Sequence, residues 1–277
     1  MAKKRLDVLL VERGLIETRE KAKRSIMAGL VFSGHMRLDK PGVKVDDDIS
    51  ITVKGKLIPY VGRGGLKLEK ALSEFTLEMS DKIMIDVGSS TGGFTDCALQ
   101  NGVRQCYAID VGYNQLDWKL RNDDHVIVME RTNFRYVTPD MLKNGMPNIA
   151  TIDVSFISLR LILPVLKQLL VDNSDVIALI KPQFEAGKEQ VGKKGIVREK
   201  NTHLQVLHTI IQFALNVGYQ LYALTYSPIT GGDGNIEFLV HLGWKKQESG
   251  ISFDSVLLED IVDQAHSNLK VQNHKSL

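Results

Sequence analysis

Short apolar runs alternate with helical patterns along the chain from about residue 63 onward. The runs are four to six residues long, which is typical of buried strands, and the longer segments between them repeat apolar residues at helical spacing. Strands are predicted at Ile83–Val87, Cys106–Ile109, Val126–Met129, Ile149–Ile152, Val176–Ile180, Leu221–Tyr226 and Ile236–His241, and helices at Thr95–Asn101, Ser158–Leu170 and Thr202–Val217. This alternation predicts an α/β fold with a Rossmann-like, mostly parallel sheet of seven strands.

The first part of the chain follows a different pattern. Leucines at helical spacing end at Gly14, and Thr18 is placed to cap a second helix. Apolar runs with a Ser33-Gly34 turn between them then predict strands. The expected elements are a helix up to Gly14, a helix over 19–28, and strands over 30–32 and 48–53. These elements predict a small α+β domain.

The charge balance changes near the end of this small domain. Residues 1–60 carry 13 Lys and Arg against 8 Asp and Glu, a net charge of +5, whereas the remainder carries 22 against 25, a net charge of −3. A basic N-terminal part is typical of a module that binds a polyanion, although a well-solvated surface gives the same balance. Pro59 and Gly62 indicate a hinge. The predicted division is a domain over 1–58, a linker over 59–62, an α/β domain over 63–245 and a C-terminal tail of unknown role over 246–277.

The composition argues against several classes of protein. An apolar content of 43% with 25% charged residues is ordinary for a globular protein. Cys97 and Cys106 lack the spacing of metal ligands, so neither a disulfide framework nor a metal site is expected. The N-terminus lacks the apolar stretch of a signal peptide, and no run of about 18 apolar residues occurs. We therefore expect a cytoplasmic protein without a membrane partner; the sequence leaves its oligomeric state open.

The small N-terminal domain resembles the S4 RNA-binding domain. The resemblance rests on Arg5-Leu6-Asp7, on Thr18 and Arg19 followed by Ala22, Ile26, Gly29 and Val31, and on Val45, Asp48 and Ile49. It implies RNA contacts from Arg5, Arg19, Lys23 and Arg24. Contacts of this kind to phosphates supply affinity and orientation rather than base-by-base specificity. For each single cation, a solvated surface residue is the alternative interpretation.

A glycine-rich loop follows the first predicted strand of the α/β domain. Its glycines allow a ligand to approach the backbone closely, and Asp110, 22 residues beyond Gly88, ends the second strand, where it could bind a ribose diol. Ser90 replaces the second glycine of a dinucleotide-binding loop, so the loop instead resembles that of class I methyltransferases, which bind S-adenosylmethionine. The expected cofactor-binding residues are Asp86, Gly88, Ser89, Ser90, Thr91, Gly92, Gly93, Phe94, Asp110, Asp153 and, beside the adenine, Glu130.

Four polar residues carry the candidate chemistry. Asp153 follows the fourth predicted strand and Lys181 the fifth; Glu237 lies in the last predicted strand, and Lys67 stands at the start of the α/β domain. Neighbouring parallel strands end at one edge of the sheet, so Asp153 and Lys181 should lie beside the cofactor loop. Each residue alone would more often form a salt bridge or a helix cap. The coincidence of Asp153 and Lys181 at adjacent strand ends, beside the glycine-rich loop, favours catalysis.

The order Lys67, Asp153, Lys181, Glu237 resembles that of FtsJ-type RNA ribose 2′-O-methyltransferases. Together with the S4-like domain, the motifs Gly64-Gly65-x-Lys67, Asp153-Val-Ser-Phe, Lys181-Pro-Gln-Phe-Glu and Gly234-Asn-x-Glu237 resemble the TlyA family over residues 4–243. Members of this family have also been called haemolysins. The resemblance implies S-adenosylmethionine-dependent methylation of the 2′-hydroxyl of cytidine in ribosomal RNA, with ribosomal subunits rather than DNA as the partner. In that scheme Lys181 orients the hydroxyl or accepts its proton, Asp153 holds Lys181, and Lys67 and Glu237 complete the network.

Residues 182–200 are expected to form a mobile basic loop over the site. Gly187 to Lys193 begins like a phosphate-binding P-loop, but Lys194 stands where a magnesium-binding Ser or Thr would be. The cations that could contact substrate phosphates are Lys188, Lys193, Lys194 and Arg198. Simple solubility is the alternative explanation for their charge.

Three other functions are weighed against this interpretation. A methyltransferase acting on a base amino group would favour an Asn/Asp-Pro-Pro-aromatic stretch where Asp153-Val-Ser-Phe stands. A membrane-active haemolysin would leave the glycine-rich loop unexplained. A non-catalytic ribosome-binding protein would not need the four polar residues.

Overall fold

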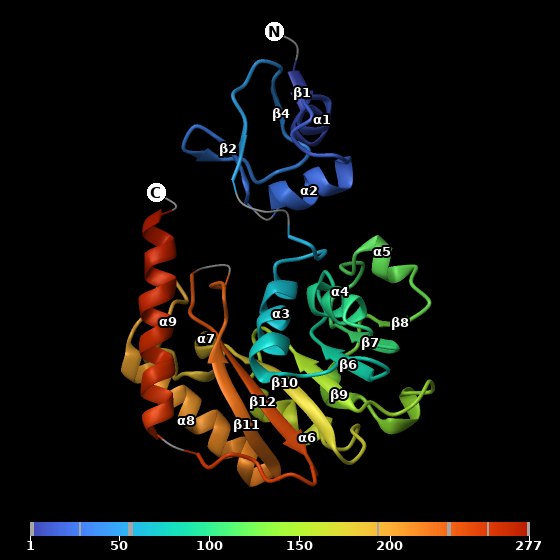
Figure 1. Ribbon diagram of the computed structural model, residues 1–277, viewed down its shortest axis with the longest axis vertical. Helices are drawn as coiled ribbons and strands as arrows, with labels where there is room; N and C mark the ends of the chain where they lie inside the picture. Colours follow the sequence, from blue (N-terminus) through green and yellow to red (C-terminus); the bar gives the residue numbers. More distant parts are fainter. Residues whose placement is uncertain are drawn as a thin grey trace. The chain divides into compact units, whose positions relative to one another are not determined.

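The computed structural model describes residues 3–27, 29–54, 58–192, 194–231, 234–253 and 255–275. Contacts within the chain divide it into two compact units, one ending at Arg63 and the other beginning at Gly64 (Figure 1). Each unit has a hydrophobic core of its own.

The N-terminal unit combines two helices with two small antiparallel sheets. Its elements are β1 (Lys3–Arg5), α1 (Leu6–Glu12), α2 (Arg19–Met27), β2 (Val31–Ser33), β3 (Met36–Arg37), β4 (Lys44–Asp46) and β5 (Thr52–Val53). Strand β1 pairs with β4, and β2 lies between β3 and β5. Both predicted helices are confirmed, the second over Arg19–Met27; Ala28, the last residue predicted for it, lies outside the described residues. The strand predicted over 48–53 is shorter, because the N–H of Ile49 bonds back to the carbonyl of Asp46 in a turn and pairing begins at Thr52.

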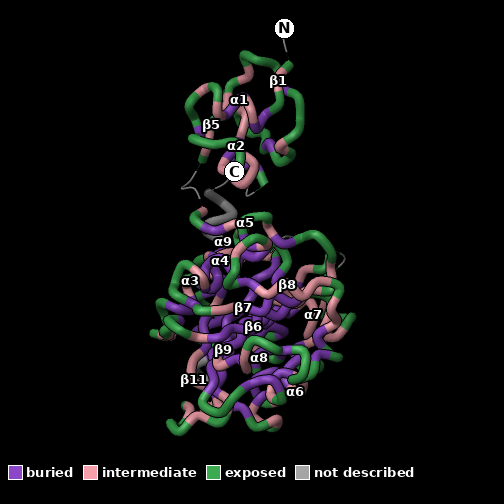
Figure 2. The backbone as a smooth tube through the Cα atoms, turned by 90° about the vertical axis from the view of Figure 1, so that its right-hand side faces the viewer, coloured by how far each residue is buried: buried purple, intermediate pink, exposed green. Residues whose placement is uncertain are grey.

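The C-terminal unit is built around the predicted seven-stranded sheet. Its strands are β6 (Ile83–Val87), β7 (Gln105–Ile109), β8 (Val126–Met129), β9 (Ile149–Ile152), β10 (Ser174–Ile180), β11 (Tyr219–Tyr226) and β12 (Phe238–Trp244). Their order is β11-β12-β10-β9-β6-β7-β8, and β12 runs antiparallel to both of its neighbours. The strands from β10 to β8 in this order are parallel. The central strands β6, β7 and β9 are buried (Figure 2).

Helices connect and flank these strands. They are α3 (Gly64–Phe75), α4 (Gly93–Gln100), α5 (Trp118–Arg121), α6 (Leu163–Leu166), α7 (Pro182–Glu185) and α8 (Lys200–Val217), with short 3-10 helices η1 (Phe134–Tyr136), η2 (Pro139–Met141), η3 (Leu159–Leu161) and η4 (Lys188–Gln190). The predictions of helices following the glycine loop and preceding β11 are confirmed. Helix α3, which was not predicted, packs against α4.

Two predicted elements of the C-terminal unit differ from the structure in ways that matter for the site or the fold. The helix expected over 158–170 is broken into η3 and α6, because the N–H of Ile162 bonds only three residues back to Leu159 and Pro164 has no N–H with which to continue an α-helix. The strand expected over 236–241 begins at Phe238, where pairing with Ile180 of β10 starts. Glu237 therefore lies directly before β12 rather than within it.

The residues beyond 246, expected to be a tail of unknown role, include the long helix α9 (Ser255–Lys275). It runs along α8 and contacts β11 (Figure 1). Its buried face joins the core of the C-terminal unit through Leu258, Ile261, Val262, Ala265 and Leu269. The helix is thus an integral part of this unit. None of the helices in the described part of the chain is long and apolar enough to cross a membrane.

Candidate active site

The four candidate catalytic residues meet at one edge of the sheet. Asp153 follows β9 directly, and Lys181 follows β10 directly. Because β12 is antiparallel to β10 and Ile180 pairs with Phe238, the start of β12 lies beside the end of β10, which brings Glu237 to the same edge. Lys67 projects from α3 and is buried. Four distant parts of the sequence therefore contribute to one cluster.

The cluster is a chain of alternating charges. Lys181 Nζ lies 2.5 Å from Asp153 Oδ1, and Lys67 Nζ lies 3.4 Å from Asp153 Oδ2. Lys67 Nζ also donates to Glu237 Oε2 at 2.8 Å. Lys67, Lys181 and Glu237 are all less than a tenth exposed. Buried charges of this kind are tolerated when each is paired, as these are.

Burial and opposite charge compete at these groups. Burial disfavours the ammonium form of Lys67, but the carboxylates of Asp153 and Glu237 outweigh burial and raise the pKa of Lys67 above its ordinary value. Burial also disfavours ionised Asp153, yet Lys67 and Lys181 together lower the pKa of Asp153. Lys67 is therefore an ammonium and Asp153 a carboxylate at neutral pH.

Three further residues support the cluster and were not singled out from the sequence. Lys181 Nζ donates to Ser155 Oγ at 3.0 Å, and Gln183 Nε2 donates to Glu237 Oε1 at 3.4 Å. Glu185 accepts from Ser158 Oγ at 2.5 Å and from the N–H of Leu159 at 2.7 Å, so it ties α7, after β10, to the start of η3, after β9. All three lie within the motifs that begin at Asp153 and Lys181, and that proximity was the signal available.

A cavity of about 410 Å³ lies beside the cluster, at the ends of β6, β7 and β9. This volume suits a small organic ligand. The lining includes Val87, Gly88, Ser90, Ile109, Asp110, Val111, Gln115, Thr132, Asn133, Phe134, Arg135, Asp153, Val154, Ser155, Phe156, Ile157 and Ile162. Four predicted cofactor-binding residues, Gly88, Ser90, Asp110 and Asp153, thus share one cavity.

Backbone conformation explains the glycine at the floor of the cavity. Gly88 has a φ of +87°, and a Cβ atom there would lie 2.5 Å from the carbonyl oxygen of Asp153. A side chain is therefore excluded both by strain and by contact. Asp110 accepts from the N–H groups of Ser90 at 2.8 Å and of Gly112 at 2.6 Å, which fixes its carboxylate at the cavity wall.

The other predicted cofactor-binding residues of the glycine-rich loop, and Glu130, are not in the described lining of the cavity. Ser89 and Phe94 are buried, Thr91 is exposed, and Gly92 and Gly93 lead into α4. The carboxylate of Glu130 accepts from the N–H groups of Gln115 at 3.0 Å and Leu116 at 3.4 Å, and from Arg121 at 2.6 Å. Glu130 thus braces the loop after β7, whereas its neighbours Thr132 and Asn133 line the cavity.

Asp86 lies within the core. Its two carboxyl oxygens accept from Thr95 Oγ1 at 2.7 Å and from Thr151 Oγ1 at 2.9 Å. Burial raises the pKa of Asp86 from 3.8 to about 6, against the effect of these two hydroxyl donors. Asp86 therefore anchors the start of the glycine loop to α4 and β9.

Replacing Asp86 with asparagine is expected to change the pH dependence of stability. Between its ordinary pKa of 3.8 and its folded pKa of about 6, the folded state holds the Asp86 proton more tightly than the unfolded state does. The free energy of unfolding contributed by this group therefore falls as pH rises through that window. Urea unfolding of both proteins at a series of pH values should show a smaller fall for Asp86→Asn. Parallel pH profiles would contradict the assignment.

Two of the predicted RNA-binding arginines hold a buried carboxylate. Asp7 is fully buried and accepts from Arg5 Nε and from an Arg19 Nη atom, each at 3.0 Å. The hydrogen bonds from Arg5 and Arg19 lower the pKa of Asp7 to about 2 despite its burial. Both guanidinium side chains remain about half exposed, at 47% and 53%. They can therefore contact RNA while bracing the fold.

The other predicted RNA-binding cations are distributed over both units. Lys23 forms an exposed pair with Glu20 at 2.8 Å, and Arg24 is partly buried. Lys188, Lys194 and Arg198 are exposed, and Lys193 lies outside the described residues.

The basic loop itself has fixed points. The Asn235 side chain accepts from the N–H of Val197 at 2.9 Å and donates to the carbonyl of Gly195 at 2.9 Å. Val197 is buried. The loop that carries Lys194 and Arg198 is thus joined to the segment that leads into Glu237.

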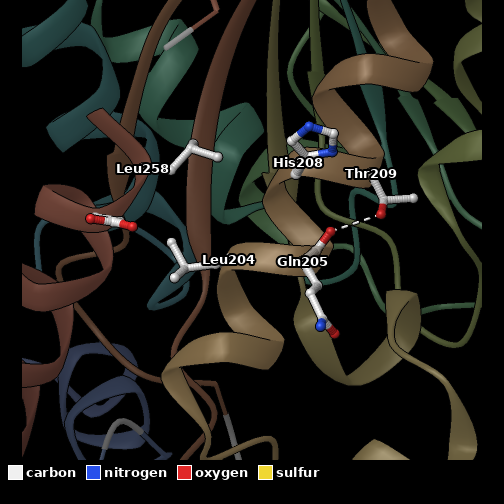
Figure 3. A pocket seen from close by; sticks show the side chains of 6 residues that line it. Leu204, Gln205, His208, Thr209 and Leu258 are labelled. Carbon is white, nitrogen blue, oxygen red and sulfur yellow. Dashed lines mark hydrogen bonds between the residues drawn. The ribbon is translucent and has the colours of Figure 1, made fainter. Parts of the chain in front are cut away.

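Two other hollows share no described lining residue with the cavity beside the cluster. One, of about 310 Å³, lies between α8 and α9 and is lined by Leu204, Gln205, His208, Thr209, Leu258 and Glu259 (Figure 3). The other, of about 510 Å³, is lined by residues 196–201, by Thr230, Gly234 and Ile236, and by His266 and Leu269 of α9. Neither has the glycine loop in its described lining. No group of three or more potential metal ligands occurs among the residues the structure describes.

Two protein-family models match successive parts of the chain. The FtsJ-like methyltransferase profile matches residues 60–244, and the S4 domain profile matches residues 4–48. The chain is 65% identical to YqxC of Bacillus subtilis over 97% of this chain and 96% of that protein. It is 37% identical to the 16S/23S rRNA (cytidine-2′-O)-methyltransferase TlyA of Mycobacterium tuberculosis, over 95% of this chain and 97% of that one.

The chain is also similar to a solved protein structure. It is of a Streptococcus thermophilus protein that carries a hemolysin name, is 53% identical, covers 99% of both chains and superposes with a TM-score of 0.79. The chain therefore belongs to the TlyA family, in which an S4 domain precedes an FtsJ-like methyltransferase domain.

Proposed function

We propose that the protein is an S-adenosylmethionine-dependent methyltransferase acting on the ribose 2′-hydroxyl of cytidine in ribosomal RNA. The observation that carries this proposal is the cluster of buried Lys67, Lys181 and Glu237 with part-buried Asp153, beside the cavity at the strand ends. The family membership of the chain and the activity named for TlyA of Mycobacterium tuberculosis support the same substrate.

The cavity fits the proposed cofactor. Gly88 lines the cavity with backbone alone, Asp110 presents a fixed carboxylate suited to a ribose diol, and Thr132, Asn133 and Phe134 can flank an adenine. Asp153 lies at the junction between this cavity and the lysine cluster. When bound, S-adenosylmethionine supplies a methyl group already activated by its sulfonium.

The remaining task of the protein is to place the acceptor hydroxyl and manage its proton. A ribose hydroxyl is a weak nucleophile, so alignment and help with deprotonation both lower the barrier. Lys181 either orients the hydroxyl by donating a hydrogen bond to it or, as the neutral amine, accepts its proton; Asp153 and Ser155 hold Lys181 Nζ in place through contacts of 2.5 and 3.0 Å. Lys67 and Glu237 position the ribose and balance the charge of the cluster.

The N-terminal unit would supply binding to structured RNA. Its half-exposed Arg5 and Arg19, with Lys23 and Arg24 on α2, form the proposed contacts to phosphates. In the C-terminal unit, Lys188, Lys193 and Arg198 would contact phosphates near the site. The 2′-hydroxyl as acceptor makes RNA rather than DNA the substrate.

Methyl transfer from labelled S-adenosylmethionine to unmodified ribosomal subunits tests the proposal. After digestion to nucleosides, we expect the label in 2′-O-methylcytidine. Label in a base or in a ribosomal protein would contradict the proposed acceptor. Cofactor binding without transfer to any subunit or to free ribosomal RNA would favour a non-catalytic role.

A further inference from the structure

The loops that follow β7 and β8 carry an unusual set of exposed aromatic rings. Tyr113 is 65% exposed, Trp118 is 75% exposed and Tyr136 is 71% exposed. Within the C-terminal unit, Tyr113 lies in the loop after β7, Trp118 begins α5, and Tyr136 ends η1, which follows β8. Exposed large rings gathered in one region mark an interaction site more often than isolated ones do.

Two of these rings are paired with arginines. The Arg131 guanidinium carbon lies 4.0 Å from the centre of the Tyr113 ring, and the Arg135 guanidinium carbon lies 5.5 Å from the centre of the Tyr136 ring. Cation–ring pairs of this kind hold the guanidinium near the aromatic surface. Each pair therefore offers an aromatic surface together with a positive charge.

Backbone hydrogen bonds join the two loops into one surface. The N–H of Arg131 donates to the carbonyl of Gly112 at 2.9 Å, and the N–H of Thr132 donates to the carbonyl of Asp110 at 2.9 Å. Glu130 holds the other end of the loop after β7 through the N–H of Gln115. Hydrogen bonds thus hold the backbone of the two loops that carry Tyr113 and Arg131.

This surface begins at the mouth of the cofactor cavity. Val111 and Arg135 both line the cavity, and each is a close neighbour in sequence of an exposed ring. A substrate whose acceptor atom lies at the Asp153 end of the cavity could extend directly over Tyr113 and Tyr136.

The two arginines also differ from the cations around them. Arg121 is paired with Glu130 at 2.6 Å, and Lys119 is paired with Asp96 at 3.0 Å. Arg131 and Arg135 form no ion pair in the part of the chain that the structure describes; Arg135 Nε donates to a neutral amide oxygen of Asn133 at 3.4 Å. Their charge is therefore available to a phosphate, which guanidinium groups bind well.

We propose that Tyr113, Arg131, Arg135 and Tyr136, with Trp118 on the adjoining helix α5, form a stacking surface for unpaired nucleotides that flank the target ribose. This inference rests on the proposed function. Unpaired bases expose the faces of their rings to aromatic side chains, whereas bases within a duplex are stacked on one another. The paired arginines bind the phosphates between these bases.

Tryptophan fluorescence can test the surface directly. The chain has two tryptophans, so Trp244→Phe leaves Trp118 as the sole tryptophan. We expect a single-stranded oligoribonucleotide to quench Trp118, and a duplex of the same sequence to quench it far less. In this background Tyr113→Ala and Tyr136→Ala should each weaken single-strand binding about tenfold. Ile251→Ala, which also removes an exposed apolar side chain, should leave binding unchanged.

Methyl transfer by the same variants separates this inference from the proposed function. Tyr136→Ala should raise KM for RNA about tenfold and leave kcat nearly unchanged, because its ring is placed to hold flanking nucleotides rather than the reacting atoms. Unchanged KM and unchanged single-strand affinity, while the wild type methylates ribose, would overturn the stacking surface alone. Equal quenching by duplex RNA, or quenching by a ribosomal protein instead, would overturn it as well. Failure of the wild type to methylate any ribose would instead overturn the proposed function.

Discussion

The variant Lys181→Ala is expected to transfer methyl groups more slowly than the wild type by a factor of about 10² to 10⁴, the usual contribution of a positioned proton-transfer group. In the wild type, Lys181 Nζ contacts Asp153 and Ser155, which also line the cavity. Lys67 cannot replace it readily, because Lys67 Nζ is held by Glu237 at 2.8 Å. Single-turnover methylation of ribosomal subunits at saturating cofactor measures this loss.

Two controls make the Lys181 result interpretable. Lys143→Ala removes an exposed lysine outside the cluster and should retain full activity. Cofactor affinity of Lys181→Ala, measured by calorimetry, should stay close to that of the wild type, since the described lining of the cavity is made by other residues. A rate within twofold of the wild type, roughly 0.4 kcal/mol in the barrier, would remove Lys181 from the mechanism.

The second large effect is expected on stability. Asp153→Ala leaves the buried Lys181 ammonium without its carboxylate and leaves Lys67 with Glu237 as its remaining partner. Removing one member of a buried ion pair costs about 3–5 kcal/mol, because the other charge stays in a poorly solvating environment. We therefore expect a clearly lower unfolding midpoint in urea for the C-terminal unit, together with loss of methyl transfer.

A double variant separates the two consequences of losing Asp153. Asp153→Ala combined with Lys181→Ala removes both charges, so stability should recover in part relative to Asp153→Ala alone. Activity should not recover, since both proposed functional groups are gone. Additive losses of stability would show that the 2.5 Å contact between these residues contributes little coupling.

Strand periodicity made most of the sheet predictable, and tertiary packing explains what was missed. The run at Ile83–Val87, apolar except for Asp86, has the same bounds in sequence and structure, because a strand buried on both faces is apolar at nearly every position. The continuous helix expected over 158–170 failed at Pro164, whose missing N–H outweighs the apolar spacing. Helix α9 was not predicted, since its stability depends on packing against α8 and β11, which are distant in sequence.

Some residues of the candidate site could be predicted from their position in the sequence, and others could not. Asp153 and Lys181 follow from position alone, because the ends of neighbouring parallel strands are adjacent. Lys67 and Glu237 followed from the family resemblance, since nothing local in the sequence shows that α3 and an antiparallel β12 reach the same edge. The link from Glu185 to Ser158 and Leu159 was missed for a similar reason: it joins two loops that are 26 residues apart in sequence.

The antiparallel insertion of β12 has a consequence for how the protein folds as it is synthesised. Strand β12 is the last strand of the chain but lies between β10 and β11. Until it has emerged from the ribosome, β10 has an open edge and β11 has no neighbour to pair with. Strand pairing between distant parts of a sequence is slow, and the edges of β10 and β11 stay unpaired until it is complete. The C-terminal unit should therefore complete its sheet, and with it the Glu237 corner of the site, only after β12 has been synthesised.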